Sequence, residues 1–358
     1  MEKIRLVDVC NPKQWKTIPT GDLLKEGYPV YGANGVIGYY SEYNHEKPVV
    51  AITCRGATCG SINITVPKAY VTGNSMCLDD VRDDIELDYL YYFLKHYDFN
   101  NVISGSAQPQ ITRQGLEKVY ISYCSRDKQV QIVEKLKKVE SIIRIRNEVI
   151  QNLEDLIKAR FVELFDTGNY PKIRLGDACK KITDGTHKTP NYIDEGITFI
   201  SAKNIVDGEL DFSDVKHISE EEYQEIQKRC QTEKNDILLS KSGSLGAPVI
   251  VRTEEKLGLF ESLAVLKYER DRFLPEFLCE QLKTDIIQRQ FTTGTKGVAI
   301  KHLHLGVIAD TEIIEPPVEE QKAFAEFVKQ VDKSKVVVQK ALDAARVLFD
   351  SLMQQYFG

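Results

Sequence analysis

The sequence lacks the patterns that mark membrane and secreted proteins. No run of about 18 apolar residues occurs among its 358 residues, so no membrane span is expected. The segment Met1–Arg5 contains no apolar stretch and does not predict a signal peptide. We therefore expect a protein of the cytoplasm that has no membrane partner.

Cysteine pairs at metal-binding spacing are also missing. The eight cysteines are scattered, and none belongs to a C-x-x-C pair. Cys54 and Cys59 are closest in sequence, but no histidine lies beside them at the spacing of a zinc ligand. Buried, reduced thiols are the expected state, with no disulfide and no metal site.

Motifs for nucleotide, methyl-transfer or hydrolytic chemistry are absent as well. There is no G-x-x-x-x-G-K-[ST] phosphate loop. Residues 315–318 (EPPV) lack both the amide and the aromatic residue of the [ND]-P-P-[FYW] motif of adenine methylation. No nucleophile is spaced to form a triad with His187 and Asp184, and no carboxylate cluster for metal ions is found. We predict no catalytic residue, and hence no enzyme activity in this chain alone.

A strong positive charge, which often accompanies DNA binding, is missing too. The chain has 47 Lys and Arg against 53 Asp and Glu, a formal net charge of −6. Residues 1–125 contain 12 basic and 14 acidic side chains, and residues 167–315 contain 20 and 25. Because duplex affinity depends on neutralised phosphates, DNA binding by this chain needs a local basic surface and a partner that adds phosphate contacts.

What the sequence does contain is an internal duplication. Residues 4–10 (IRLVDVC) recur as residues 173–179 (IRLGDAC). Further along, an amphipathic segment at 88–95 corresponds to one at 275–282. A shorter pattern follows each segment: Ser104-Gly105 with Ile111, Leu116 and Val119 matches Thr293-Gly294 with Ile300, Leu305 and Ile308. The two halves are therefore expected to share one fold.

Each half ends in a long segment with a heptad pattern. Apolar residues at alternating spacings of four and three run from Ile132 to Leu164, and a second series runs from Phe324 to Tyr356. Each member of the second series lies 192 positions after its counterpart. Neither segment contains Pro or Gly, so each predicts one helix of roughly 40 residues, about 60 Å long. The sustained register predicts a coiled-coil seam.

Three cationic residues interrupt these seams: Arg146, Arg160 and Lys335. Their stems can pack while their charged heads reach water. Alternatively, their heads pair with acids on the facing helix and set its register, and the sequence leaves both interpretations open. Two equivalent units joined head to tail can close on each other with pseudo-two-fold symmetry, which makes the two helices antiparallel.

Both globular halves are mixed α/β, with short strands predicted at residues 48–53, 60–66, 236–240 and 248–251. Polar loops that contain small residues lie beside the strands. Such loops let backbone approach a ligand, and their Lys, Arg, Asn, Gln, Ser and Thr side chains suit phosphates and base edges. One loop of this kind is also typical of an ordinary surface turn, whereas six on two equivalent domains are more specific: 31–35, 55–58, 105–110, 184–190, 201–204 and 240–244.

These segments resemble the specificity subunits of type I restriction enzymes over essentially the whole chain. The similarity is carried by residues 184–190 (DGTHKTP) with 196–205 (GITFISAKNI), 235–246 (NDILLSKSGSLG), and 28–35 (YPVYGANG) with 55–60 (RGATCG). Residues 316–321 (PPVEEQ) resemble the family's junction into a conserved helix. The first junction, residues 125–129 (SRDKQ), keeps the glutamine but lacks the prolines.

The resemblance implies an α+β fold. Two similar mixed α/β target recognition domains are separated by two long antiparallel coiled-coil helices with pseudo-two-fold symmetry. The expected division is residues 1–125 for the first target recognition domain and 126–166 for the central conserved coiled-coil helix. Residues 167–315 then form the second recognition domain, and 316–358 the C-terminal conserved coiled-coil helix.

The resemblance also implies a function. The chain is expected to be the non-catalytic DNA specificity subunit of a type I restriction–modification system, in which each recognition domain reads one half of a bipartite double-stranded DNA target. Two methyltransferase subunits and the restriction subunits dock on it. No cofactor is expected in this chain, because the partner subunits bind S-adenosylmethionine, ATP and Mg²⁺.

The polar loops supply the candidate DNA-binding residues. Phosphate contacts are expected from Arg55, Lys188, Lys203, Lys241, Lys296 and Lys301. Base-edge contacts are expected from Asn34, Gln108, Gln110, Thr186, His187 and Ser242, and the remaining candidates are Thr58, Arg113 and Asn204. Two other classes of protein stay open: an enzyme that cuts DNA by itself, and a coiled-coil adaptor without nucleic-acid function.

Overall fold

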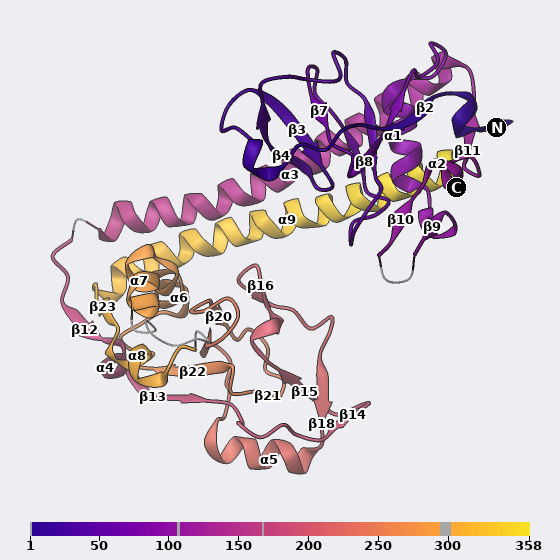
Figure 1. Ribbon diagram of the computed structural model, residues 1–358. Coiled ribbons are helices and arrows are strands. Elements are labelled where there is room, and N and C mark those ends of the chain that lie inside the picture. The colour runs from indigo at the N-terminus through magenta and orange to yellow at the C-terminus, as the bar shows by residue number, and fades with distance from the viewer. Residues whose placement is uncertain (1, 106–107, 167, 294–301) are drawn as a thin grey trace. The chain divides into compact units, whose positions relative to one another are not determined.

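A computed structural model describes residues 2–105, 108–166, 168–293 and 302–358 of the chain (Figure 1). The chain divides into two units, each made of one globular half and a part of both long helices. Unit 1 is Met1–Asn147 with Gln339–Gly358, and unit 2 is Glu148–Val338. Within the described ranges, no helix is both long enough and apolar enough to cross a membrane.

Unit 1 consists of short strands, two short α-helices and one end of each long helix. The long helices are α3 (Arg126–Phe165) and α9 (Val318–Phe357), and the short ones are α1 (Leu87–His96) and α2 (Arg113–Leu116). The strands are β1 (Glu2–Arg5), β2 (Asn11–Gln14), β3 (Tyr28–Gly32), β4 (Gly35–Tyr40), β5 (Val50–Thr53), β6 (Ile62–Ile64), β7 (Tyr70–Val71), β8 (Ser75–Asp79), β9 (Ile103–Ser104), β10 (Gln110–Ile111) and β11 (Tyr120–Tyr123).

Unit 2 contains a similar series of elements. Its shorter helices are α4 (Leu175–Ala178), α5 (Glu220–Arg229), α6 (Pro275–Lys283), α7 (Asp285–Thr293) and α8 (Leu305–Asp310). Its strands are β12 (Lys172–Arg174), β13 (Cys179–Asp184), β14 (Tyr192–Ile193), β15 (Ile197–Ile200), β16 (Ile205–Val206), β17 (Glu209–Leu210), β18 (Lys216–Ile218), β19 (Ile237–Ser240), β20 (Pro248–Ile250), β21 (Leu257–Leu259), β22 (Leu263–Tyr268) and β23 (Glu312–Ile314).

The two units repeat one topology. Each has an antiparallel four-stranded sheet, ordered β2-β8-β5-β6 in unit 1 and β13-β22-β19-β20 in unit 2. Each unit also has a second sheet with one parallel pair, β3 with β7 in the three-stranded sheet of unit 1 and β15 with β21 in the four-stranded sheet of unit 2. A two-stranded ribbon, β1 with β11 or β12 with β23, precedes the long helix. The duplication predicted from the sequence is therefore a duplication of the fold.

Hydrogen bonds correct the predicted alignment of the two halves in one region. The Ile111 N–H donates to the Cys54 carbonyl at 3.1 Å, and the Leu303 N–H donates to the Lys241 carbonyl at 2.9 Å. Cys54 and Lys241 each directly follow the equivalent strands β5 and β19. Ile111 thus corresponds to Leu303 and not to Ile300, which lies outside the described residues.

The predicted match of Leu116 with Leu305 and of Val119 with Ile308 is also wrong, and again the true counterpart lies three residues later in the sequence. The Leu6 N–H donates to the Val119 carbonyl and the Leu175 N–H to the Thr311 carbonyl, each at 2.8 Å. Val119 thus corresponds to Thr311. The apolar pattern favoured the wrong register because Thr311 is polar, although it is buried and its hydroxyl donates to the Val307 carbonyl at 2.8 Å.

In each unit, a sheet, a short helix and both long helices share a hydrophobic core. In unit 1, Leu90 and Phe93 of α1 lie three apart on one helical face and pack with residues of β5 and β8. Phe357 of α9 joins them, with its ring centroid 5.3 Å from that of Tyr89 and 5.8 Å from that of Phe93. The long helices are therefore part of each domain's core.

Unit 2 builds its core in the same way, with phenylalanines. Phe161 and Phe165 of α3 pack against Phe277 of α6 and Phe324 of α9. Ring centroids are 5.0 Å apart for Phe165 and Phe277, and 5.5 Å apart for Phe161 and Phe324, distances at which aromatic pairs attract.

Within each unit, α3 and α9 run side by side and antiparallel (Figure 1). In unit 1, Lys135 contacts Tyr356 and Arg146 contacts Ala341. Residues later in α3 therefore contact residues earlier in α9. In unit 2, Glu154 of α3 meets Lys335 of α9, while Phe161, further along α3, meets the earlier Phe324. The antiparallel pairing expected from the duplication is present in both units.

The three cations on the seams behave differently from one another. Lys335 pairs with Glu154 on the facing helix at 2.8 Å, and Arg146 donates to the Ala341 carbonyl of the facing helix. Arg160 instead pairs with Glu163 of its own helix at 2.6 Å and is half-buried. Lys335 and Arg146 thus make contacts across the seam, and both contacts fit one alignment of α3 with α9.

A buried glutamine ties the start of α3 to its domain. Gln129 is fully buried, and its amide oxygen accepts the Glu86 N–H at 2.8 Å. Its amide nitrogen donates to the carbonyls of Asp84 at 3.1 Å and Cys124 at 2.8 Å. One side chain therefore satisfies three backbone groups where the domain passes into the helix.

Gln321 does the same at the equivalent position of α9. It is fully buried, accepts the Leu274 N–H at 3.0 Å, and donates to the carbonyls of Arg272 and Pro316, both at 2.9 Å. The glutamine shared by the two predicted junctions thus serves the same purpose in both units.

We expect Gln321→Leu to destabilise the protein strongly. The substitution keeps side-chain bulk but leaves three backbone groups without their partner, and each such group costs about 1–3 kcal/mol when buried. The free energy of unfolding, measured in urea by circular dichroism, should fall by at least that amount. The exposed Gln330→Leu on the same helix is the control, with a change below about 0.5 kcal/mol. Equal effects of the two variants would contradict the anchoring role.

Candidate nucleic-acid interface

A surface hollow in unit 1 brings together three of the predicted DNA-binding residues. Arg55, Gln110 and Arg113 line it, although they come from two segments far apart in the sequence. An antiparallel bridge pairs Arg55 directly with Gln110. The other lining residues are Pro12, Lys13, Gln14, Met76, Ile111 and Thr112.

Local structure explains how these side chains meet. Gly56, directly after Arg55, has a φ of +89°, a conformation that suits glycine, and its N–H donates to the Pro109 carbonyl at 3.3 Å. Thr112 caps α2 by accepting the Gly115 N–H at 3.1 Å, which places Arg113 in the first turn of that helix. The loop after β5 and the segment from β10 to α2 therefore lie against each other.

The hollow is a local basic surface. Lys13, Arg55 and Arg113 contribute positive charge, and no carboxylate lines it. Among the described residues, none of these three side chains is ion-paired with an acid. Arg113 donates to the Pro12 carbonyl at 3.3 Å, and the Lys13 ammonium lies 3.8 Å from the centre of the Trp15 ring. Cations held without an acidic partner are what a phosphate backbone requires.

The other candidates of unit 1 lie on nearby loops. Asn34 is exposed at the turn between β3 and β4, and that turn is tied to β5 because the Thr53 hydroxyl donates to the Ala33 carbonyl at 2.5 Å. Thr58 is half-buried in the loop after β5, where its carbonyl accepts the Ser61 N–H at 3.0 Å. Gln108 is exposed in the segment before β10.

In unit 2, the corresponding loops gather at the same end of the four-stranded sheet. Thr186 follows β13 and forms a bridge with Phe260. The Lys241 N–H donates to the Ser262 carbonyl at 2.8 Å, and the Ala202 N–H donates to the Ser262 hydroxyl at 3.0 Å. The predicted loops at 184–190, 201–204 and 240–244 are therefore neighbours.

A buried ion pair joins two of these loops. The Lys241 ammonium contacts the Asp184 carboxylate, and both side chains are only 3% exposed. Arg229 binds the other oxygen of Asp184, and His187 lies 3.2 Å from the carboxylate. Burial raises the pKa of Asp184, but hydrogen bonds from Lys241 and Arg229 outweigh that effect and hold the pKa below its ordinary value.

Unit 1 has a neutral pair at the position of this ion pair. The strand pairings equate Gln14 with Asp184 and Cys54 with Lys241. The Gln14 amide donates to the Cys54 sulfur at 2.9 Å and to the Gly73 carbonyl at 2.9 Å. Both domains thus link the ends of the same two strands beneath their loops, one with charges and one without.

The structure separates the candidates of unit 2 by what their side chains already bind. Lys241 is held by Asp184, and Lys203 pairs with Asp214 at 2.9 Å. Asn204 is buried, where its amide oxygen accepts the Ser201 N–H at 3.0 Å and its amide nitrogen donates to the carbonyls of Asp211 and Asp214, both at 3.1 Å. These contacts hold the loops in place.

The remaining candidates of unit 2 are more accessible. His187 and Lys188 are exposed, Thr186 and Ser242 are half-buried, and Lys188 has no acidic partner within the described part of the chain. His187 is also 2.6 Å from Glu261 through its Nδ1. Lys296 and Lys301 lie outside the described residues.

Sequence reasoning missed several residues of these surfaces. Lys13 and Gln14 end a strand whose sequence contains no glycine, so a search for polar, glycine-containing loops passes over them. His302 takes the place of Gln110 once the alignment is corrected; burial, and then the nearby Lys241 and His304, lower its pKa. The 192-residue offset of the long helices is the signal that could have found it.

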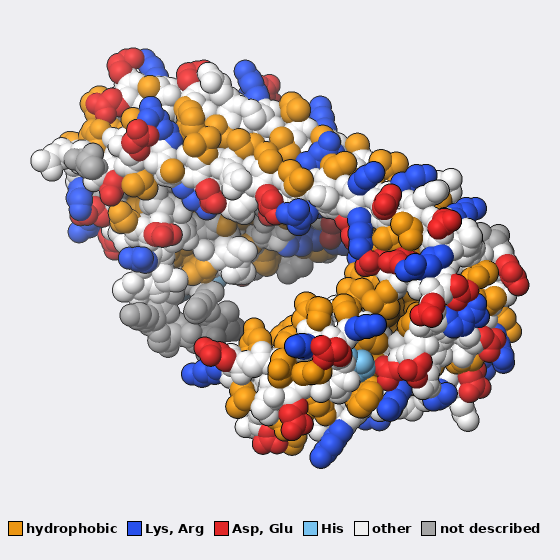
Figure 2. Space-filling model, turned by 90° about the horizontal axis from the view of Figure 1, so that it is seen from above, with side chains coloured by type: hydrophobic (Ala, Val, Ile, Leu, Met, Phe, Trp, Pro, Cys, Tyr) orange, Lys and Arg blue, Asp and Glu red, His pale blue; other side chains and the backbone are white. Residues whose placement is uncertain are grey.

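On the face shown in Figure 2, Lys and Arg side chains are interspersed with Asp and Glu. The net charge of −6 is therefore compatible with a small basic surface in unit 1.

The fold and these surfaces define a duplicated binding protein, in which two domains of one topology present polar loops at the same end of equivalent sheets. The family model described as "Type I restriction modification DNA specificity domain" matches residues 1–155 and 168–344. The chain belongs to this family.

Individual relatives are similar to different extents. The specificity subunit of the type I restriction enzyme EcoBI of Escherichia coli is 29% identical over 162 residues, covering 45% of this chain and 34% of that protein. The EcoprrI subunit of the same species is 28% identical over 122 residues, covering 34% and 30%. The chain thus matches about a third of the length of these two relatives.

Other similarities cover nearly the whole chain. The MjaVIII specificity subunit of Methanocaldococcus jannaschii is 19% identical over 370 residues, covering 90% of this chain and 87% of that protein. A solved structure of a type I restriction–modification S subunit from M. genitalium has a TM-score of 0.64 at 17% identity, covering 100% and 96% of the two chains. The two chains share a fold.

We expect Lys241→Met to destabilise unit 2, because it leaves the Asp184 carboxylate buried without its main partner. Breaking a buried ion pair from one side typically costs about 3–5 kcal/mol. The double variant Asp184→Asn with Lys241→Met removes both charges and should recover part of the loss in urea unfolding. Lys203→Met, which breaks an exposed pair, should cost less than about 1 kcal/mol.

The same ion pair predicts a pH dependence. The folded-state pKa of Asp184 lies below the unfolded value of about 3.9, so its contribution is complete above that pH and is lost as the pH falls through the folded-state value. Below about pH 4 the wild-type chain should therefore lose stability more steeply than Asp184→Asn. Parallel pH profiles would argue against an ionised Asp184.

Proposed function

We propose that this chain is the DNA specificity subunit of a type I restriction–modification system and that it reads a bipartite double-stranded DNA target. The observation that carries the proposal is the hollow of unit 1, which Lys13, Arg55, Arg113 and Gln110 line and where none of the three cations is ion-paired with an acid among the described residues. Cations of this kind bind phosphates, and a glutamine amide can pair with a base edge.

Unit 2 recognises the second half of the DNA target in this proposal. We assign base contacts there to Thr186, His187 and Ser242, and a phosphate contact to Lys188. We place His302 next to these residues in the interface. Lys203, Lys241 and Asn204 act by holding the reading loops. The recognition domains are residues 1–125 and 167–315, and the conserved helices are 126–166 and 316–358. The supporting observation is that equivalent segments gather at equivalent sheet ends.

The chemistry of the system belongs to partner subunits in this proposal. Two methyltransferase subunits carry S-adenosylmethionine, restriction subunits use ATP and Mg²⁺, and this chain is not catalytic. The complex works in the cytoplasm, where its DNA lies. Apolar side chains exposed on the long helices offer docking positions for these subunits: Ile142, Ile145, Val347 and Leu348 in unit 1, and Val149, Leu156, Val162, Val336 and Val337 in unit 2.

A mobility-shift assay on randomised duplex DNA, with and without a methyltransferase subunit and Mg²⁺, tests the proposal. Sequence-selective binding without cleavage supports it. Cutting by the chain alone would instead identify an independent nuclease, and a lack of binding even with the partner would leave a coiled-coil adaptor. A DNA-cutting site needs grouped carboxylates, and among the described residues the one three-ligand group found contains a single carboxylate.

We expect Arg55→Ala and Arg113→Ala to weaken DNA binding by the complex. Loss of one phosphate contact should reduce the steepness with which the logarithm of the DNA-binding constant falls with the logarithm of the salt concentration, by about 1. The affinity should fall to a similar extent for every DNA sequence. Gln110→Ala should relax base preference in one half-site only, at a cost of about 1–3 kcal/mol. Lys3→Ala, an exposed cation on β1, is the matched control. Loss of preference in both half-sites would refute the domain assignment.

The spacing of the two half-sites should depend on the helices, since α3 and α9 are each 40 residues long. Removing one heptad from each helix shortens both by about 10 Å while preserving the seam. We expect selection from random DNA to return the same two half-sequences with a different gap, or weaker binding. An unchanged gap would exclude the helices as the spacer.

A further inference from the structure

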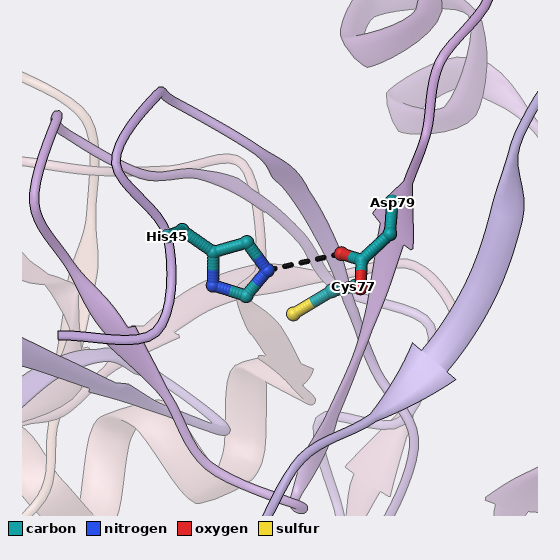
Figure 3. A group of neighbouring side chains, drawn as sticks. All are labelled: His45, Cys77 and Asp79. Carbon is teal, nitrogen blue, oxygen red and sulfur yellow. Dashed lines mark hydrogen bonds and ion pairs between the residues drawn. The ribbon is translucent and has the colours of Figure 1, made fainter.

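Three potential metal ligands converge in unit 1 around strand β8. Cys77 and Asp79 are two residues apart on β8, so their side chains project from the same face of the strand. His45 reaches them from the loop between β4 and β5 (Figure 3). One ligand atom from each of the three residues lies within 4.8 Å of the other two.

Asn44 determines which nitrogen of His45 carries a proton. The Asn44 amide nitrogen donates to the Val71 carbonyl at 3.0 Å, and its amide oxygen accepts the Val71 N–H at 2.9 Å. The same oxygen lies 2.6 Å from His45 Nδ1, so Nδ1 must be the donor in that contact. The lone pair of a neutral His45 is then on Nε2.

Nε2 in turn faces an acceptor. The Asp79 Oδ1 atom lies 2.9 Å from His45 Nε2. A lone pair and a carboxylate oxygen repel each other at this distance unless a positive charge, either a second proton or a metal ion, lies between or beside them. The pair therefore requires a cation.

Cys77 favours a metal ion over a proton alone. Its side chain is fully buried, and its sulfur has no hydrogen-bond partner within the described part of the chain. Figure 3 shows that sulfur directed toward the imidazole. A proton shared by His45 and Asp79 leaves the thiol without a role, whereas a metal ion uses all three side chains.

The surroundings support the ligands as they do in metal sites. Asp79 Oδ2 accepts the indole N–H of Trp15 at 3.1 Å, and the Trp15 ring packs edge-on against His45 with centroids 5.2 Å apart. Ligating histidines commonly donate their second N–H to an oxygen, as His45 does to Asn44, and ligating carboxylates are themselves hydrogen-bonded. A surface hollow gives access from solvent, and its charged or titratable lining residues are Lys13, His45, Glu46, Lys47, Asp79 and Asp80.

We propose that His45 Nε2, Cys77 Sγ and Asp79 Oδ1 bind one zinc ion, with water from the hollow as the fourth ligand. This nitrogen, sulfur and oxygen set suits tetrahedral Zn²⁺. On binding, the thiol proton passes to solvent and a Zn–S bond replaces the S–H bond. The ion fastens the loop of His45 to β8.

Only unit 1 has this arrangement in the described residues. The strand pairings equate Cys77 with Val265 and Asp79 with Lys267, so unit 2 offers neither ligand. Sequence spacing predicts no metal site because His45 lies far from the other two residues along the chain. The proposal is independent of the proposed function, since it concerns stability of the first domain.

Cobalt binding tests the proposal on the full-length chain. After treatment with a chelator, titration with Co²⁺ should produce a thiolate-to-cobalt absorption band that saturates at one equivalent and disappears when Zn²⁺ is added. Cys77→Ser and His45→Gln should lose the band. Cys10→Ser, at a buried cysteine whose thiol donates to the Leu6 carbonyl at 3.2 Å, should keep it.

Zn²⁺ should also raise the melting temperature of the wild-type chain and of Cys10→Ser but not that of Cys77→Ser. X-ray absorption of the zinc-loaded wild type, which needs no variant to fold, should report one sulfur among nitrogen and oxygen neighbours. Absence of the cobalt band in the wild type, or an equal band in Cys77→Ser, would overturn the proposal and leave a protonated His45 paired with Asp79.

Discussion

One buried glutamine fixes each junction at which a domain passes into its long helix, in addition to the shared hydrophobic core. Gln129 and Gln321 each satisfy three backbone groups that would otherwise be left without partners where a loop passes into a helix. Because unsatisfied buried groups are costly, the helix cannot easily pivot on its domain. A helix can act as a measured spacer only if its ends are held in this way, so the proposed reading of a divided DNA site rests on these two side chains.

The duplication conserves geometry while the chemistry varies. At the base of the reading loops, Gln14 with Cys54 in unit 1 occupies the position of Asp184 with Lys241 in unit 2. The charged pair holds Lys241 inside the domain, while the cations of unit 1 stay at the surface. One topology can thus present two different surfaces, which is what recognition of two different half-sites requires. The proposed zinc site, with ligands in one domain alone, extends the same divergence.

An acidic protein that binds DNA must concentrate its positive charge. Here the net charge is −6, yet Lys13, Arg55 and Arg113 share one hollow that no carboxylate lines. Many other cations are paired with nearby acids, as Lys203 is with Asp214. A cation that is already paired with an acid is less available to a phosphate, so in the proposed function affinity for the duplex should rest on few contacts of this chain and on the proposed partner subunits.

The sequence by itself determined both long helices and several strands, because heptad spacing, the lack of Pro and Gly, and short apolar runs are local properties of the chain. It also showed the duplication, from which the antiparallel pairing of the helices was inferred. Only the tertiary structure decided which loop residues remain accessible. Lys241 and Asn204 look like surface residues in a polar loop, but both are buried. Lys241 is held by Asp184, which is distant in sequence, and Asn204 is held by hydrogen bonds with Ser201, Asp211 and Asp214 near it in the chain. The meeting of His45 with Cys77 and Asp79 was equally hidden, because these residues lie far apart along the chain. The register between the halves was indicated by the 192-residue offset of the long helices, but hydrogen bonds within the two domains established it.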